Sequence, residues 1–154
     1  MAFIPDPPAV VLEIPVSGPQ GPVGPQGPQG PAGPSGGAAI NFTADSTIGG
    51  HRVIVLNANE APEYADNSNS SHIHKVMGVT LNAGNAGDTI SIVRSGEVVE
   101  PTWNWTLNSP VFLGTNGLLT QTPPQSPAVF SQIVGFPKTP TTLFVHLREP
   151  LLLI

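Results

Sequence analysis

The sequence contains no cysteine among its 154 residues. A disulfide framework, a thiolate metal site and a cysteine nucleophile are therefore all excluded. If several copies of the chain associate, non-covalent contacts must hold them together.

Charged residues are also scarce, at 10% of the chain, and the ten acidic residues outnumber the five basic ones. The basic residues are spread singly over the C-terminal part of the sequence, without the cluster that nucleic-acid binding requires. We therefore expect no nucleic-acid partner. The five basic residues are Arg52, Lys75, Arg94, Lys138 and Arg148.

Long hydrophobic runs and a secretory signal are missing from the sequence. The first stretch, MAFIPDPPAVVLEIPVSG, has no basic start and contains four prolines, which does not fit a signal peptide. No apolar run approaches the roughly 20 residues of a membrane-spanning helix. We expect no membrane insertion, and a protein that is made in a cytoplasm and is used there or released by lysis.

The common catalytic motifs are missing as well. The sequence has no G-x-S-x-G elbow, no H-E-x-x-H pair and no P-loop. The carboxylates of Asp88, Glu97 and Glu100 fall in expected turns and at strand ends, where solvated charges are usual. We predict neither enzymatic activity nor a cofactor.

Glycine, in contrast, is abundant and periodic. It occupies every third position from residue 18 to residue 36, and proline follows each of the first six of these glycines. This is the collagen pattern, in which three polyproline-type chains wind about one axis where only a residue without a Cβ fits. A flexible Pro/Gly linker is the alternative, but it needs no unbroken register. The predicted axis residues are Gly18, Gly21, Gly24, Gly27, Gly30, Gly33 and Gly36.

The predicted collagen-like stalk, residues 18–37, is short. At about 3 Å per residue it forms a rod of roughly 55–60 Å. The third position of its triplets contains neither a second proline nor a charge, so the rod should be marginal alone. We expect the rest of the chain to supply trimerisation. The residues in the third position are Gln20, Val23, Gln26, Gln29, Ala32 and Ser35.

Residues 1–17, before the stalk, carry the short apolar run AVVLEIPV. In an extended strand the side chains of Val10, Leu12 and Ile14 share one face. Such a strand can pair with the sheet edge of another protein, so we interpret the segment as an anchor. A disordered tail is the alternative, because chain termini are often loose.

Residues 38–154 show a β pattern throughout, without a sustained helical period. Short strands separated by Gly, Asn, Pro and Asp turns predict an all-β knob, a small sandwich or barrel. The last four residues, LLLI, are bare apolar sequence that we expect to be buried between the subunits of a trimer. The expected strands lie within 51–57, 74–82, 88–100, 103–107, 110–114, 117–122, 131–137 and 141–147.

Two tryptophans alternate in the sequence WNWT. If this stretch is a strand, the rings of Trp103 and Trp105 point to the same face. Paired indoles can stack on sugar rings, and a host surface glycan is one candidate ligand. Packing in the core or at a subunit interface is the favoured interpretation, because tryptophan is usually largely buried.

Two histidines alternate in the same way in SSHIHK. On a strand, His72 and His74 share a face, and three chains would place six imidazoles about one axis. Such a set has enough ligands for an octahedral metal ion. A pair of exposed histidines beside a loop is the commoner arrangement, and we predict no metal site.

Three stretches of the β segment resemble the C-terminal domain of bacteriophage fibre proteins, in particular head (capsid) fibres with collagen-like stalks. They are YADNSNSSHIHKVMGVT, WNWTLNSPVFLGTNGLLTQTPP and VGFPKTPTTLFVHLREPLLLI. The resemblance covers most of the chain from Gly50 onward. It implies a homotrimeric fibre on the virion surface, joined through its N-terminus to the major capsid protein or another virion protein. The knob would then project outward.

Two alternatives stay open at this point. One is a tail or collar fibre whose knob binds a host surface glycan; the short stalk and the lack of a large adhesin domain favour a capsid decoration instead. The other is a collagen-like filament of a spore surface. Those filaments tend to place threonine in the third triplet position, where this sequence has glutamine and valine.

Overall fold

The computed structural model describes residues 2–21, 24 and 39–154, and the chain divides into two units, Met1–Pro31 and Ala32–Ile154. The described residues of the first unit contain no helix or strand, and their side chains are exposed. Three of the predicted collagen glycines, Gly18, Gly21 and Gly24, are among them. The others, Gly27, Gly30, Gly33 and Gly36, lie outside the described residues. The structure holds one chain, so the triple helix stays a prediction.

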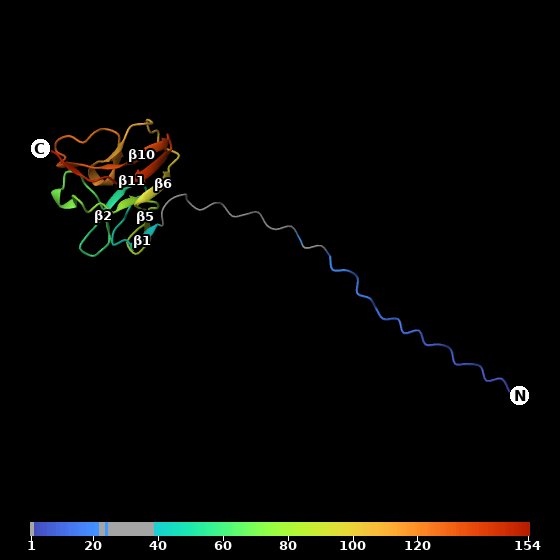
Figure 1. Ribbon diagram of the computed structural model, residues 1–154. Helices are drawn as coiled ribbons and strands as arrows, with labels where there is room; N and C mark the ends of the chain where they lie inside the picture. The colour runs from blue at the N-terminus through green and yellow to red at the C-terminus, as the bar shows by residue number, and fades with distance from the viewer. Residues whose placement is uncertain (1, 22–23, 25–38) are drawn as a thin grey trace. The chain divides into compact units, whose positions relative to one another are not determined.

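The second unit is built of β-strands, which confirms the predicted all-β domain (Figure 1). Two short 3₁₀ helices, η1 (Ser70–His72) and η2 (Thr115–Gly117), interrupt the strands. The strands are β1 (Ile40–Thr43), β2 (Val53–Leu56), β3 (Pro62–Tyr64), β4 (Gly78–Thr80), β5 (Thr89–Val93), β6 (Ser95–Val99), β7 (Val111–Leu113), β8 (Leu119–Thr120), β9 (Phe130–Ser131), β10 (Ile133–Thr139), β11 (Thr142–His146) and β12 (Leu151–Leu152).

Ten of these strands form two five-stranded sheets. The first sheet has the order β1-β5-β4-β2-β3, and the second has the order β6-β11-β10-β7-β8. A two-stranded sheet pairs β12 with β9, and every paired strand is antiparallel to its neighbours.

The two large sheets share one core, as in a sandwich. Side chains alternate between the two faces of each strand, and those on the inner faces meet in this core. Val53 and Val55 of β2 enter it from the first sheet, and Leu143 and Val145 of β11 enter it from the second. Phe130 of β9 is fully buried in the same cluster. Apolar residues at every second position therefore hold the layers together.

The first sheet is buried on its other face as well. Ile54, between the two core valines of β2, joins Ile90 and Ile92 of β5 in a second apolar cluster. The segment after β1 covers this cluster with Ala44 and Ile48. Because both faces are covered, β2 reads as a continuous apolar run, VIVL, rather than as an alternating strand.

The chain passes from the first sheet to the second through a single residue. Arg94 lies between β5, which belongs to the first sheet, and β6, an edge strand of the second. The first residue of β1, Ile40, pairs with Ile92, two residues before this crossing. The β domain is thus entered close to the corner where its two sheets are connected.

Candidate functional site

Trp103 and Trp105 lie side by side, but not on a strand. The ring centroids are 5.2 Å apart with an interplanar angle of 55°, and both half-buried rings pack against the core. The predicted strand over 103–107 is wrong because the chain turns here: Trp103 N–H donates to the carbonyl of Glu100, and Trp105 N–H donates to that of Pro140. The tilted pair offers no flat platform for a sugar, which favours a packing role.

A polar contact lies against this pair. His51 Nδ1 is 3.1 Å from Glu100 Oε2, and the imidazole meets the Trp103 ring edge to face with centroids 5.3 Å apart. The backbone N–H and the hydroxyl of Thr102 both donate to Glu100 Oε1. These two hydrogen bonds, and to a smaller extent the nearby His51, lower the pKa of Glu100 below its usual value.

His72 and His74 do not share a face, so the predicted strand arrangement of SSHIHK is wrong. Asn69 caps η1 by accepting a hydrogen bond from Ser71 N–H, and the 3₁₀ turn buries His72. His72 Nδ1 accepts from the backbone N–H of Asp66 at 3.0 Å. His74 has a left-handed backbone with φ of 60° and is exposed.

The metal alternative needed both histidines on one face, and the structure separates them. Among the residues that the structure describes, no group of three or more histidine, aspartate or glutamate side chains is placed to hold a metal ion.

Asp66 organises the loop that leads to η1. Its Oδ1 accepts from the backbone N–H and the hydroxyl of Ser68, and its Oδ2 accepts from the backbone N–H of Asn116, fifty residues away. Partial burial raises the pKa of Asp66. These hydrogen bonds and the nearby His72 together lower that pKa by a larger amount, so the net shift is downward.

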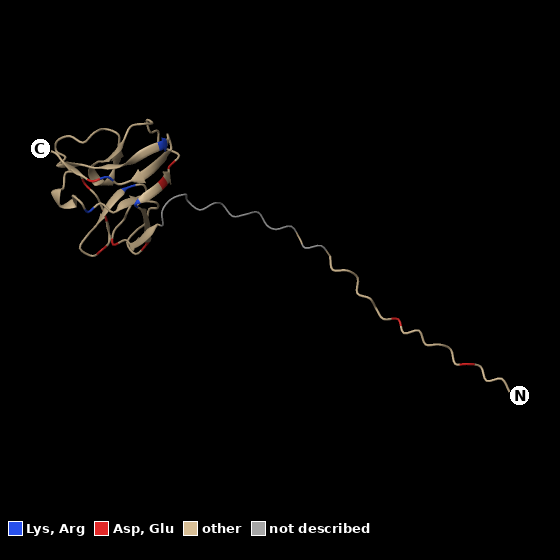
Figure 2. Ribbon diagram, viewed as in Figure 1, with Lys and Arg blue, Asp and Glu red and all other residues tan. Residues whose placement is uncertain are grey.

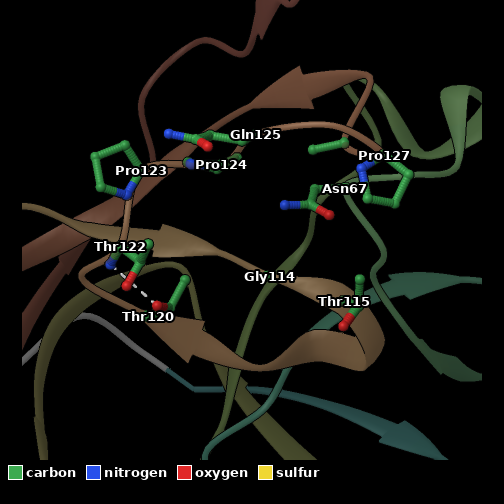
Figure 3. Close-up of a pocket in the computed structure, with 10 residues that line it drawn as sticks. Asn67, Gly114, Thr115, Thr120, Thr122, Pro123, Pro124, Gln125 and Pro127 are labelled. Atoms are coloured by element: carbon green, nitrogen blue, oxygen red, sulfur yellow. Dashed lines mark hydrogen bonds between the residues drawn. The ribbon is translucent and has the colours of Figure 1, made fainter.

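An open pocket of about 320 Å³ lies beside the next residue, Asn67 (Figure 3). Asn67 is only 5% exposed; its amide nitrogen donates to the carbonyl of Leu113, whereas no described residue donates to its Oδ1. The residues that line the pocket are uncharged and combine proline rings with hydroxyl and amide groups. They are Asn67, Gly114, Thr115, Thr120, Thr122, Pro123, Pro124, Gln125, Pro127 and Ala128.

The second sheet carries apolar side chains on the face turned away from the core, which the sequence analysis did not identify. Phe144 of β11 pairs directly with Phe136 of β10, and the two side chains are 44% and 39% exposed. In β11 the residues on either side of Phe144, Leu143 and Val145, are fully buried, so Phe144 points outward. Phe136, its register partner, lies on the same face. We call this surface the outer apolar face; it comprises Val99, Phe112, Ile133, Phe136 and Phe144.

The predicted anchor residues are exposed in an extended segment. The exposed fractions of Val10, Leu12 and Ile14 are 91%, 81% and 75%. This segment contains two acidic residues and no basic residue, whereas charges of both signs are scattered over the β domain (Figure 2). The partner of the segment stays a prediction.

The C-terminal leucines are exposed in the single chain, with Leu151 and Leu152 in β12. Their burial between subunits therefore stays a prediction as well.

No protein-family model matches this chain, and no curated protein matches it. In the part of the chain that the structure describes, no helix is both long and apolar enough to cross a membrane.

Proposed function

We propose that this protein is a homotrimeric fibre on the surface of a bacteriophage particle. Its N-terminal segment binds a virion protein, most consistently the major capsid protein; a collagen-like rod follows, and the β domain is the distal knob. The viral setting follows from the resemblance of the three stretches quoted in the sequence analysis to head fibre proteins.

One observation supports the fibre architecture: at the three repeat glycines that the structure describes, no contact within the chain explains why glycine is needed. A Cβ added at Gly18, Gly21 or Gly24 meets no atom of the same chain within 4 Å. None of these three glycines has a positive φ. This supports a requirement for glycine that neighbouring chains impose, as at the axis of a triple helix.

Three copies also make a weak anchor effective. A single exposed strand of a few apolar residues binds weakly because ordering it costs conformational entropy. A rod that delivers three such strands together raises their effective concentration to the millimolar range, which can increase the avidity by a factor of ~10² or more. The exposed row of Val10, Leu12 and Ile14 fits this role.

The test uses phage particles that lack the fibre. These particles are incubated with the full chain or with a chain lacking residues 1–17, and are then sedimented. We expect the intact chain to pellet with the particles and the shortened chain to stay in the supernatant as a folded trimer. Equal pelleting of both would place the attachment in the β domain and reverse the proposed orientation.

A matched pair of single substitutions sharpens this test. Leu12→Ser removes an apolar side chain from the proposed binding face, whereas Val11→Ser changes the opposite face of the same extended segment. We expect Leu12→Ser to weaken attachment more than Val11→Ser. Equal effects would argue against binding as a β-strand.

The pocket beside Asn67 favours a second candidate function, binding of a neutral glycan by the knob. Its hydroxyl and amide groups suit sugar hydroxyls, its proline rings supply apolar contact, and its volume lies at the lower end of ligand pockets. A glycan array probed with the full chain tests this function. Binding that survives Gln125→Ala and Thr122→Val would exclude this pocket.

A further inference from the structure

We propose that the outer apolar face of the second sheet is the contact between β domains in the trimer. This inference rests on the proposed function, because the glycine repeat is what calls for further copies of the chain. The occupant of the face is therefore a second copy of this protein.

The face has the composition of an interface. Phe136 and Phe144 are register partners on two inner strands of the sheet, and Val99 on the edge strand is 58% exposed. Single exposed apolar residues are ordinary, whereas several on one face of a sheet point to a binding surface. Phenylalanine is among the residues enriched in protein interfaces.

Charge on this face is low and balanced. Glu97 lies opposite Phe144 in the strand pairing, and its carboxylate forms an ion pair with Lys138 of β10. The chain as a whole carries a net charge of −5, so three copies repel one another over most surfaces. Because β11 lies between β6 and β10, this ion pair crosses the outer apolar face beside Phe144. Its two charges neutralise each other within a contact that is otherwise apolar.

The stalk holds the β domains close to one another. In the proposed triple helix the three copies of Gly36 would meet at the axis, and the four residues that follow could reach at most roughly 14 Å. Ile40 of each copy therefore lies near the axis. Domains of about 35 Å diameter, as expected for this chain length, are then held at millimolar effective concentration. A modest apolar contact suffices to keep them associated.

The outer apolar face begins near this point of entry. Ile40 pairs with Ile92, and three residues later the chain starts β6, whose first residue, Ser95, pairs with His146 of β11. Phe144 is two residues further along β11, or about 7 Å. Within the β domain the C-terminal leucines form another exposed apolar stretch, and the C-terminus marked in Figure 1 lies on the opposite side of this domain from β1.

The experiment measures the mass of the full chain by sedimentation and its β structure by circular dichroism. Phe144→Arg places an additional positive charge at the centre of the face, beside the ion pair of Glu97 and Lys138. We expect the intact chain at three times its mass of 15.9 kDa. We expect Phe144→Arg to be folded and to need about 30-fold or more higher concentration to associate.

Two further variants make the outcome decisive. The double variant Phe136→Thr with Phe144→Thr keeps β-forming residues, and it is the one to read if Phe144→Arg does not fold. Leu152→Arg is the matched control at the C-terminal leucines, and we expect it to stay trimeric.

Folded face variants that associate like the intact chain would overturn the assigned contact and leave the proposed function standing. Dissociation of Leu152→Arg alone would move the contact to the C-terminus. A monomeric intact chain would overturn the proposed function together with this inference.

Discussion

The carboxylate of Glu100 and the imidazole of His51, 3.1 Å apart, join the two sheets of the β domain. Glu100 directly follows β6 of the second sheet, and His51 lies two residues before β2 of the first. Trp103 packs on the imidazole and on the core beneath it, so the contact and the ring close this end of the sandwich together.

The hydrogen bonds from Thr102 lower the pKa of Glu100 more than the nearby His51 does. We expect carbon-13 NMR to show that Thr102→Val raises the pKa of Glu100 toward its usual value, because one of the two strongest hydrogen bonds is lost. His51→Asn, which tolerates the left-handed backbone at this position, should raise the pKa of Glu100 less. The opposite order would show that His51 dominates.

Acid should destabilise the protein partly through Asp66. A carboxyl whose pKa is lower in the folded than in the unfolded chain adds stability above its unfolded pKa, and this stability is lost as the pH falls through the folded pKa. The pKa of Asp66 is lowered, so the decline should occur below about pH 4. In urea denaturation, Asp66→Asn should show a shallower decline than the intact chain over that range. An equal decline of stability with pH in both proteins would contradict this role of Asp66.

Gly135 allows β10 to lie close to the backbone of β11 at Phe144, in the outer apolar face. A Cβ at this position would collide with the backbone carbonyl of Phe144, which cannot move without disturbing the β10–β11 pair. Gly135→Ala should therefore lower the free energy of unfolding by about 1–3 kcal/mol in urea denaturation. Gly50→Ala is the control, because its Cβ would make ordinary contacts and should change stability by less than about 0.5 kcal/mol. Similar losses in both variants would contradict the steric argument.

Trp103 should matter for stability. Trp103→Ala removes a half-buried ring that packs against the core, and we expect a loss of about 1–3 kcal/mol in the free energy of unfolding. Leu107→Ala, at an exposed position a few residues later, should have little effect. Unchanged stability of Trp103→Ala, together with lost glycan binding, would restore the sugar-binding interpretation of this residue.

Strand positions were predictable where apolar runs are dense. The segments containing β2 and β11, VIVL and TLFVH, were identified because buried valines and leucines leave a clear pattern. Three strands were missed. β1 has only four residues, two of them polar, β3 begins with Pro62, and β12 has only two residues. The run 88–100 was expected as one strand, but the chain changes sheets at Arg94.

The site residues show what a periodic pattern leaves undecided. Trp103 and Trp105 were expected on one face of a strand, but a turn places their rings next to each other. For His72 and His74, local hydrogen bonding by Asn69 outweighed the alternation. The outward direction of Phe144 was not seen, because the run LFV reads equally well as a strand buried on both faces.

The entry of the chain at Ile40 has a mechanical consequence. A pull from the preceding residues reaches the β domain through β1, which pairs with β5 on one side only and in four register positions. Ile40 and the crossing at Arg94 lie at the same end of this pair, so tension loads the β1–β5 hydrogen bonds one after another, beginning at Ile40. Sequential loading separates strands at lower force than simultaneous shear. The edge strand β1 would thus separate first and lengthen the extended segment before the β domain. The strands that enclose Phe130 would keep their packing, so that β1 could pair with β5 again when the force falls.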